Sequence, residues 1–230
     1  MNVIDTIEDE NIKFYLEYLK YERRVSDNTV ESYGENLKML KQALNKNILN
    51  LTTTEIRDYI QNLEATPKTK AHYLSVFNSF YNYMIFNEKL SANPCSGIRS
   101  PKLEKKLPNY LTGEEIDKLL DIKLIKPIDY RNKAMLEVLF ATGTRISELI
   151  NLKLNQIDFD ECIIRVLGKG KKDRIIPIGN TALEYLALYI NEYRPFILKT
   201  RVSEYVFVNK NGTKMSRQGF FKILKKLVAS

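Results

Sequence analysis

The sequence predicts a mainly α-helical chain with a small antiparallel β-sheet, organised as two domains. Three observations support this fold class. Apolar residues recur at helical spacing over the first ninety residues. Two short apolar segments, 163–167 and 174–178, flank a glycine–lysine turn as the strands of a β-hairpin do. Two prolines flank a charged segment over 100–108, which is typical of an extended linker.

Composition limits the class of protein. The chain has 230 residues, 44% of them hydrophobic, which is enough for ordinary cores. It carries 36 basic and 28 acidic side chains, a net charge of +8 that favours a polyanionic partner. Cys95 and Cys162 are expected to be reduced thiols rather than metal ligands. Because no signal peptide or long apolar segment is present, we expect a cytoplasmic protein without a membrane partner.

The first domain, 1–93, is expected to contain four helices. The first is amphipathic and ends near Arg24, and apolar residues of the second and the fourth also fall on single faces. The starts of the second, third and fourth helices are marked by Ser26 as an N-cap, a Thr52–Glu55 capping box and Thr66-Pro67. Short connections between these helices favour a small bundle.

A linker over 94–110 leads into the second domain, 111–230. A second capping box, Thr112 with Glu115, marks its first helix. Helices are expected over 113–121, 130–142, 145–153 and 180–193, with a last one opening at Ser216. Strands are expected over 163–167, 174–178 and 205–208.

Two basic residues of the second domain are candidates for chemistry on a phosphodiester. Arg145 follows a Thr-Gly turn at the start of a helix, where its planar guanidinium and nearby N–H groups suit an anion. Lys169 lies between two glycines at the hairpin tip, where it could enter a groove and protonate a leaving oxygen. The alternatives are a solvated arginine paired with Glu148, and a lysine that touches phosphates without catalysis.

Other chemistries are disfavoured. The segment around Lys169 lacks the spacing of a nucleotide-binding P-loop. The single histidine, His72, is expected on a helix surface, away from any triad or metal cluster. Most of the 14 tyrosines fall at apolar helical positions, and Tyr205, the last of them, begins a segment that reads as a strand.

The chain resembles the tyrosine recombinase (phage integrase) family, closest to its bacterial Xer type. The resemblance extends over essentially the whole chain. It is carried by Phe14–Leu19, Ser26–Tyr33, Asn93-Pro94, Leu107–Thr112, Arg131–Leu136, Ala141–Arg145, Val208–Gly212 and Ser216–Gly219. Thr144 departs from the family pattern, which has an apolar residue there. The resemblance implies a SAM-like core-binding domain at 1–93, a basic linker, and an α+β catalytic domain at 111–230.

The resemblance also assigns roles. Arg145 corresponds to the first catalytic arginine and Lys169 to the hairpin lysine. The family's later His-x-x-Arg motif and nucleophilic tyrosine do not follow Gln218 in this sequence. We therefore expect a C-terminally truncated catalytic domain with no nucleophile, and neither a metal nor a cofactor, because the family's chemistry conserves phosphodiester energy in a phosphotyrosyl bond. The implied partners are a double-stranded DNA recombination site and further recombinase protomers, which form a homo- or hetero-tetramer on DNA.

Contacts to DNA are expected at helix ends and at the hairpin. The candidates are Asn28, Thr29, Lys68, Thr69, Lys70, Lys171, Lys172, Arg174, Arg217 and Gln218. Of these, Arg217 and Gln218 are suited to reading guanine and adenine in the major groove. The alternative for each position is a solvated helix end.

Three functions remain open. The first is a site-specific recombinase or integrase that binds DNA but, as this chain, does not cleave it. The second is a non-catalytic DNA-binding regulator that occupies recombination sites. The third is a basic helical protein-interaction module that does not bind DNA.

Overall fold

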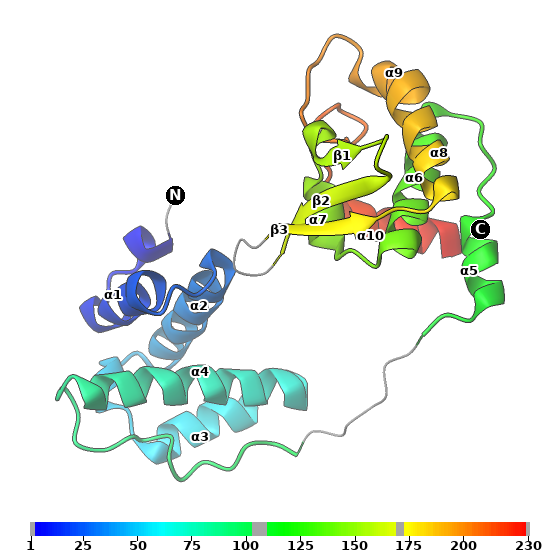
Figure 1. The fold of residues 1–230 in the computed structure, drawn as a ribbon. Coiled ribbons are helices and arrows are strands. Elements are labelled where there is room, and N and C mark those ends of the chain that lie inside the picture. The colour runs from blue at the N-terminus through cyan, green and yellow to red at the C-terminus, as the bar shows by residue number, and fades with distance from the viewer. Residues whose placement is uncertain (1–2, 103–109, 169–172, 229–230) are drawn as a thin grey trace. The chain divides into compact units, whose positions relative to one another are not determined.

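The structure is a computed structural model that describes residues 3–102, 110–168 and 173–228 (Figure 1). It divides into two compact units, Met1–Leu107 and Pro108–Ser230, called here the N-terminal and the C-terminal unit. None of the helices in these described ranges is long and apolar enough to cross a membrane. The expected fold class, mainly helical with a small antiparallel sheet, is confirmed.

Helices make up the N-terminal unit. They are the 3-10 turns η1 (Val3–Thr6) and η3 (Ile48–Asn50), the π-helical turn η2 (Tyr18–Glu22), and the α-helices α1 (Glu10–Glu17), α2 (Asp27–Leu44), α3 (Thr53–Asn62) and α4 (Pro67–Phe86). The expected N-caps are present: Ser26 on α2, Thr52 with Glu55 on α3, and Thr66 with proline at the start of α4. Local sequence therefore fixes where these helices begin.

The core of the N-terminal unit forms around α4, which packs against α1, α2 and α3. Phe77, Phe80 and Tyr81 of α4 are fully buried. The Tyr81 hydroxyl donates a hydrogen bond to the carbonyl of Ile48 at 2.7 Å, so this buried polar group has a partner. The first expected helix continues α1 into η2 and stops at Arg23, because Arg24 adopts a left-handed backbone with φ of 50°.

The C-terminal unit combines helices with one sheet. Its helices are α5 (Gly113–Leu120), α6 (Pro127–Thr142), α7 (Ile146–Asn151), the 3-10 turn η4 (Leu154–Gln156), α8 (Asn180–Leu188), the π-helical turn η5 (Tyr189–Tyr193), α9 (Arg194–Leu198) and α10 (Arg217–Val228). Its strands are β1 (Ile157–Asp158), β2 (Ile163–Leu167) and β3 (Asp173–Pro177), and β1 was not expected from the sequence.

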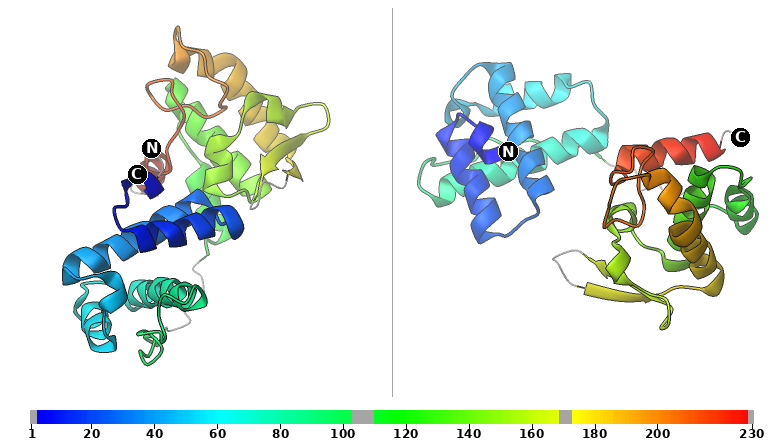
Figure 2. Two further views of the ribbon diagram at one scale, coloured as in Figure 1. Left: turned by 90° about the vertical axis from the view of Figure 1, so that its left-hand side faces the viewer. Right: turned by 90° about the horizontal axis from the view of Figure 1, so that it is seen from above.

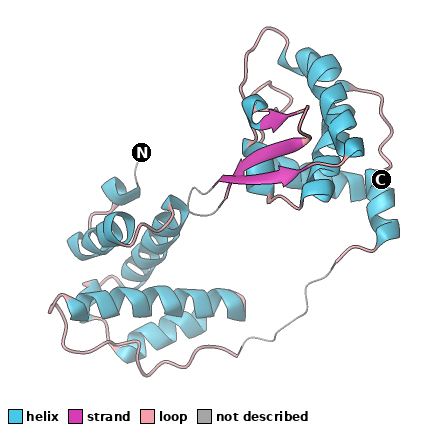
Figure 3. Cartoon of the chain, in the orientation of Figure 1, coloured by secondary structure: helices cyan, strands magenta, loops and turns pink. Residues whose placement is uncertain are grey.

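The sheet is antiparallel with strand order β1-β2-β3 (Figure 3). Its main ladder is the expected hairpin, in which Val166 pairs with Arg174 and Leu167 with Asp173. On β2, Ile164 and Val166 are buried and Arg165 between them is exposed, so one face of this strand packs on the core.

Helix α6 is central to the core of the C-terminal unit. It packs along α8, as the ribbon views also show, and contacts η5 and α9 (Figure 2). Ala134, Met135 and Val138 of α6 are fully buried. Helix α10 packs against α7, the helix that follows Arg145.

The expected strand over 205–208 is wrong. The segment forms only two isolated β-bridges among the described residues, Lys153 with Tyr205 and Val208 with Lys214. Val206, Phe207 and Val208 are nevertheless fully buried, which explains why the apolar run resembles a strand. Side chains of Tyr189, Arg131 and Arg194 donate hydrogen bonds to backbone carbonyls of this segment, as a neighbouring strand would.

Candidate functional site

The turn between α6 and α7 places Arg145. Helix α6 ends at Thr142 and is capped by Gly143, whose left-handed backbone (φ 58°) reverses the chain without the strain a side chain would bring. Arg145 is the N-cap residue of α7, in extended conformation. Thr144 between them is buried, and its hydroxyl lies 3.1 Å from that of Thr142, so this polar departure from the family pattern has a partner.

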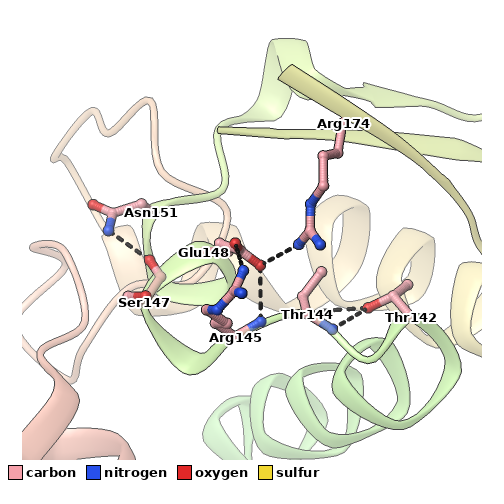
Figure 4. Close-up of polar contacts among 7 residues, drawn as sticks. All are labelled: Thr142, Thr144, Arg145, Ser147, Glu148, Asn151 and Arg174. Atoms are coloured by element: carbon pink, nitrogen blue, oxygen red, sulfur yellow. Dashed lines mark hydrogen bonds and ion pairs between the residues drawn. The ribbon is translucent and has the colours of Figure 1, made fainter. Parts of the chain in front are cut away.

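Glu148 holds two arginines together (Figure 4). Its carboxylate accepts a hydrogen bond from the Arg145 N–H at 2.9 Å and another from the Arg145 guanidinium at 2.9 Å. It also accepts one from the guanidinium of Arg174, on β3, at 2.8 Å. The Glu148 side chain is only 5% exposed, whereas those of Arg145 and Arg174 are 63% and 46% exposed. The site thus presents two cations to solvent from one buried anion.

The electrostatics of Glu148 follow from these contacts. Burial by itself raises the pKa of its carboxyl group, but the hydrogen bonds from Arg145 and the positive charge of Arg174 outweigh burial and leave the pKa below its ordinary value. The carboxylate is therefore charged at neutral pH. It restrains two side chains that would otherwise move freely in water.

This lowered pKa predicts how the stability of the C-terminal unit depends on pH. Because the folded state binds the proton less readily than the unfolded chain, the stabilising contribution is present above the ordinary pKa of 4.5 and is lost as pH falls through the lower, folded value. We expect denaturant unfolding of the unit to show a loss of stability below about pH 4.5 that is smaller in Glu148→Gln than in the wild-type chain. An identical acid response in both proteins would contradict this assignment.

Sequence reasoning anticipated part of this site. Arg145 and Arg174 were both candidates, and the structure brings them together. Lys169, Lys171 and Lys172 lie outside the described residues. The Glu148 contact to Arg145 was considered as a plain ion pair, but its second contact, to a strand 26 residues later, was not expected.

The two remaining candidates of the C-terminal unit lie at the start of α10. Arg217 and Gln218 are its first two residues, and both are exposed. The Ser216 hydroxyl accepts a hydrogen bond from the N–H of Gly219 at 3.0 Å and so caps this end. Since α10 packs against α7, the two exposed side chains belong to a helix anchored beside the one that carries Arg145.

The candidates of the N-terminal unit occupy two helix starts. Asn28 and Thr29 lie in the first turn of α2, and Lys68, Thr69 and Lys70 in that of α4. Asn28 and Lys68 are exposed, and the others are partly buried. The Thr29 and Thr69 hydroxyls lie within 3 Å of the capping hydroxyls Ser26 and Thr66. The Lys70 side chain donates a hydrogen bond to the carbonyl of Gln61 at 2.6 Å and so satisfies a carbonyl in the last turn of α3.

Sequence reasoning missed two buried arginines, Arg131 on α6 and Arg194 at the start of α9. A signal was available for Arg131. It lies three, four and seven residues before Ala134, Met135 and Val138, on the same helical stripe as these fully buried residues. An arginine on an apolar stripe indicates a buried guanidinium with fixed acceptors.

Comparison with known sequences shows the family. Residues 109–230 match the model described as the phage integrase family, and residues 12–88 match the phage integrase N-terminal SAM-like domain. The tyrosine recombinase XerD of Oceanobacillus iheyensis is 38% identical over 225 residues, covering 94% of this chain and 76% of the relative. The tyrosine recombinase XerD of Halalkalibacterium halodurans is 39% identical over 229 residues, with 95% and 76% coverage.

Solved structures agree at the level of the fold. XerH site-specific recombinase bound to its palindromic difH substrate matches with a TM-score of 0.71 at 17% identity, over 97% of this chain and 72% of that one. A lambda integrase in a tetramer bound to a Holliday junction matches with a TM-score of 0.70 at 18% identity, over 94% and 61%. By the sequence matches in particular, the chain belongs to the phage integrase family, as a Xer-like tyrosine recombinase.

Proposed function

We propose that this chain binds a double-stranded DNA recombination site and that Arg145 holds the phosphodiester on which the family's reaction takes place. The observation that carries the proposal is the geometry around Glu148. A buried carboxylate fixes an exposed guanidinium at a helix start and ties it to Arg174 of the hairpin. A preorganised cation stabilises the extra negative charge of a phosphoryl transition state better than a mobile one does.

The hairpin supplies the other proposed contacts at the phosphate. Lys169 acts as the general acid for the leaving oxygen, while Lys171, Lys172 and Arg174 bind neighbouring phosphates. The anchoring of Arg174 by Glu148 supports this proposal, because it joins the start of β3, beside the hairpin turn, to the turn that carries Arg145. Proton transfer from a positioned side chain is worth about 10²–10⁴-fold in rate.

Sequence recognition is assigned to the exposed helix starts. Arg217 and Gln218 contact base edges, and Asn28, Thr29, Lys68, Thr69 and Lys70 contact DNA from the N-terminal unit. In this proposal the chain consists of a DNA-binding domain (1–93), a linker (94–110) and a catalytic domain (111–230). A related integrase is known as a tetramer on a Holliday junction, which supports assembly with further protomers on DNA and hence action at the nucleoid in the cytoplasm.

We further propose that the 230-residue chain does not cleave DNA by itself. Within it no tyrosine follows Tyr205, and no histidine follows His72. Without a nucleophile no covalent intermediate forms. A chain that occupies a recombination site without cutting it would compete with an intact recombinase, which is the regulatory alternative.

DNA binding is expected to depend steeply on salt. Each phosphate contact releases condensed counterions, so Arg145→Ala should weaken binding modestly and reduce the slope of log affinity against log salt by about 1. The measurement is fluorescence anisotropy with a labelled duplex over a salt series. Lys118→Ala, on α5, is the matched control and should leave the slope unchanged. If the wild-type chain does not bind duplex DNA even at low salt, the proposal is wrong and the protein-interaction module becomes the better interpretation.

Cleavage is tested with a nicked suicide duplex. We expect no covalent protein–DNA adduct on a denaturing gel, whereas a full-length relative from the same assay provides the positive control. An adduct would show that this chain contains a nucleophile. Tyr205→Phe would then be the first variant to test, since Tyr205 is the last tyrosine in the sequence.

A further inference from the structure

Among the described residues of the C-terminal unit, two buried guanidiniums contact neither Glu148 nor any other carboxylate. Arg131 is 5% exposed and Arg194 is 7% exposed. No carboxylate lies within 4.0 Å of either guanidinium among the described residues. Burial lowers the pKa of both side chains, which shows that keeping them charged is costly. A charge buried at such a cost needs well-placed acceptors.

Those acceptors are concentrated on one segment, 203–208. Arg194 donates to the carbonyl of Val206 at 3.1 Å and to those of Ser203 and Tyr205 at 2.7 Å each. Arg131 donates to the carbonyl of Val208 at 3.0 Å, and its other edge is fixed by the Asn132 side chain at 2.8 and 3.2 Å. The two side chains therefore replace the neighbouring strand that the segment lacks.

The same segment is bonded on its other side to the chain that leaves α7. The N–H of Val206 donates to the carbonyl of Leu152 at 2.9 Å, and the N–H of Leu154 donates to the carbonyl of Glu204 at 3.0 Å. Further along, the N–H of Met215 donates to the carbonyl of Phe207 at 3.3 Å, just before α10 begins. Segment 203–208 thus connects the helix after Arg145 with the helix that begins at Arg217.

We propose that Arg131 and Arg194 are positioning residues that hold α10 in register with α7, so that base recognition by Arg217 and Gln218 is tied to the phosphate held by Arg145. The inference rests on the proposed function. The planar guanidinium suits this task because its N–H groups point in fixed directions, so one side chain aligns several carbonyls at once. A lysine keeps the charge but has no rigid fork, and an apolar residue satisfies no carbonyl.

The test separates recognition from binding and from stability. A duplex is first selected from a randomised pool by the wild-type chain, and single-base variants of it define the base preference. Arg194→Lys and Arg131→Lys should reduce the affinity ratio between the selected duplex and its variants by about fivefold or more, while the salt slope stays that of wild type. A merely structural role would lower the unfolding temperature without changing this ratio in the folded protein.

Two further variants keep the test decisive. Tyr189→Phe removes one neutral hydrogen bond to the Val206 carbonyl, 3.1 Å long in the structure, and should give a smaller loss of base preference if the arginine variants do not fold. Lys133→Met is the matched control, because Lys133 is a largely buried cation of α6, its side chain 12% exposed, that contacts Glu137 and the Leu120 carbonyl instead of segment 203–208. It should lower stability and leave base preference unchanged.

The outcomes distinguish the two proposals. If the wild-type chain does not bind DNA, the proposed function fails. If it binds with normal salt dependence but without base preference, or if the arginine and Tyr189 variants keep the full preference while folded, the positioning role is overturned and DNA binding stands.

Discussion

Replacing Glu148 with glutamine is expected to lower the free energy of unfolding of the C-terminal unit by about 1–3 kcal/mol at neutral pH. The carboxylate accepts three charge-assisted hydrogen bonds, two of them from guanidinium groups, and an amide oxygen cannot replace both carboxylate oxygens. The effect stays below that of a fully buried ion pair, because Arg145 and Arg174 are exposed enough for water to take over part of the lost contact. Denaturant unfolding of the full chain measures it.

The non-specific DNA affinity of Glu148→Gln should not fall with its stability. Removing an anion beside two phosphate-binding cations makes the surface more positive, so non-specific affinity at low salt should stay the same or rise. Glu161→Gln is the control, since Glu161 is an exposed acid in a turn of the same unit, and it should leave stability near wild type. A Glu148 variant of unchanged stability would mean that the contacts with the two arginines contribute little in solution.

The largest loss of stability is expected for Phe207→Ala, at about 3–5 kcal/mol in the C-terminal unit. Phe207 is fully buried, and its ring stacks on that of Tyr189 with centroids 5.8 Å apart and an angle of 7° between ring planes. Truncation removes this contact and leaves a cavity in the segment that links α7 and α10. Hydrogen exchange measured by mass spectrometry on the full chain locates the loss by residue.

Phe77→Ala provides the reciprocal control for the division into units. Phe77 is fully buried in the core around α4, so its truncation should speed exchange in residues 3–102 and leave the C-terminal unit protected. Phe207→Ala should do the reverse. If either substitution exposed amides of both units equally, the chain would unfold as one cooperative body, and the two-unit description would not apply to its energetics.

Helix starts could be predicted from the sequence because the interactions that mark them are local. Thr52 with Glu55, and Thr112 with Glu115, form reciprocal capping boxes in the structure just as their three-residue spacing indicates. The hairpin also depends on local interactions. Its second strand, β3, begins and ends one residue earlier than expected, at Asp173 and Pro177. In each case the partners lie within a few residues, so no knowledge of the tertiary fold is needed.

The segment over 205–208 shows where local reasoning fails. Its apolar residues, two of them β-branched, suit a buried strand, and Val206, Phe207 and Val208 are indeed fully buried. Whether such a segment is a strand depends on what bonds its carbonyls. Here the side-chain donors come from Arg131, Arg194 and Tyr189, which lie 77, 12 and 17 residues from their acceptors in sequence.

The candidate site, too, has features that the sequence predicts and features that it does not. The sequence by itself determined the fold class, the family resemblance, most helix starts and the place of Arg145 at the start of a helix, because propensity, capping and periodicity act over a few residues. Only the tertiary structure decided that Glu148 joins Arg145 to Arg174, and that two arginines lie buried against a backbone segment. Such contacts depend on which surfaces meet when the chain folds, and the sequence does not say which acceptor a buried charge meets.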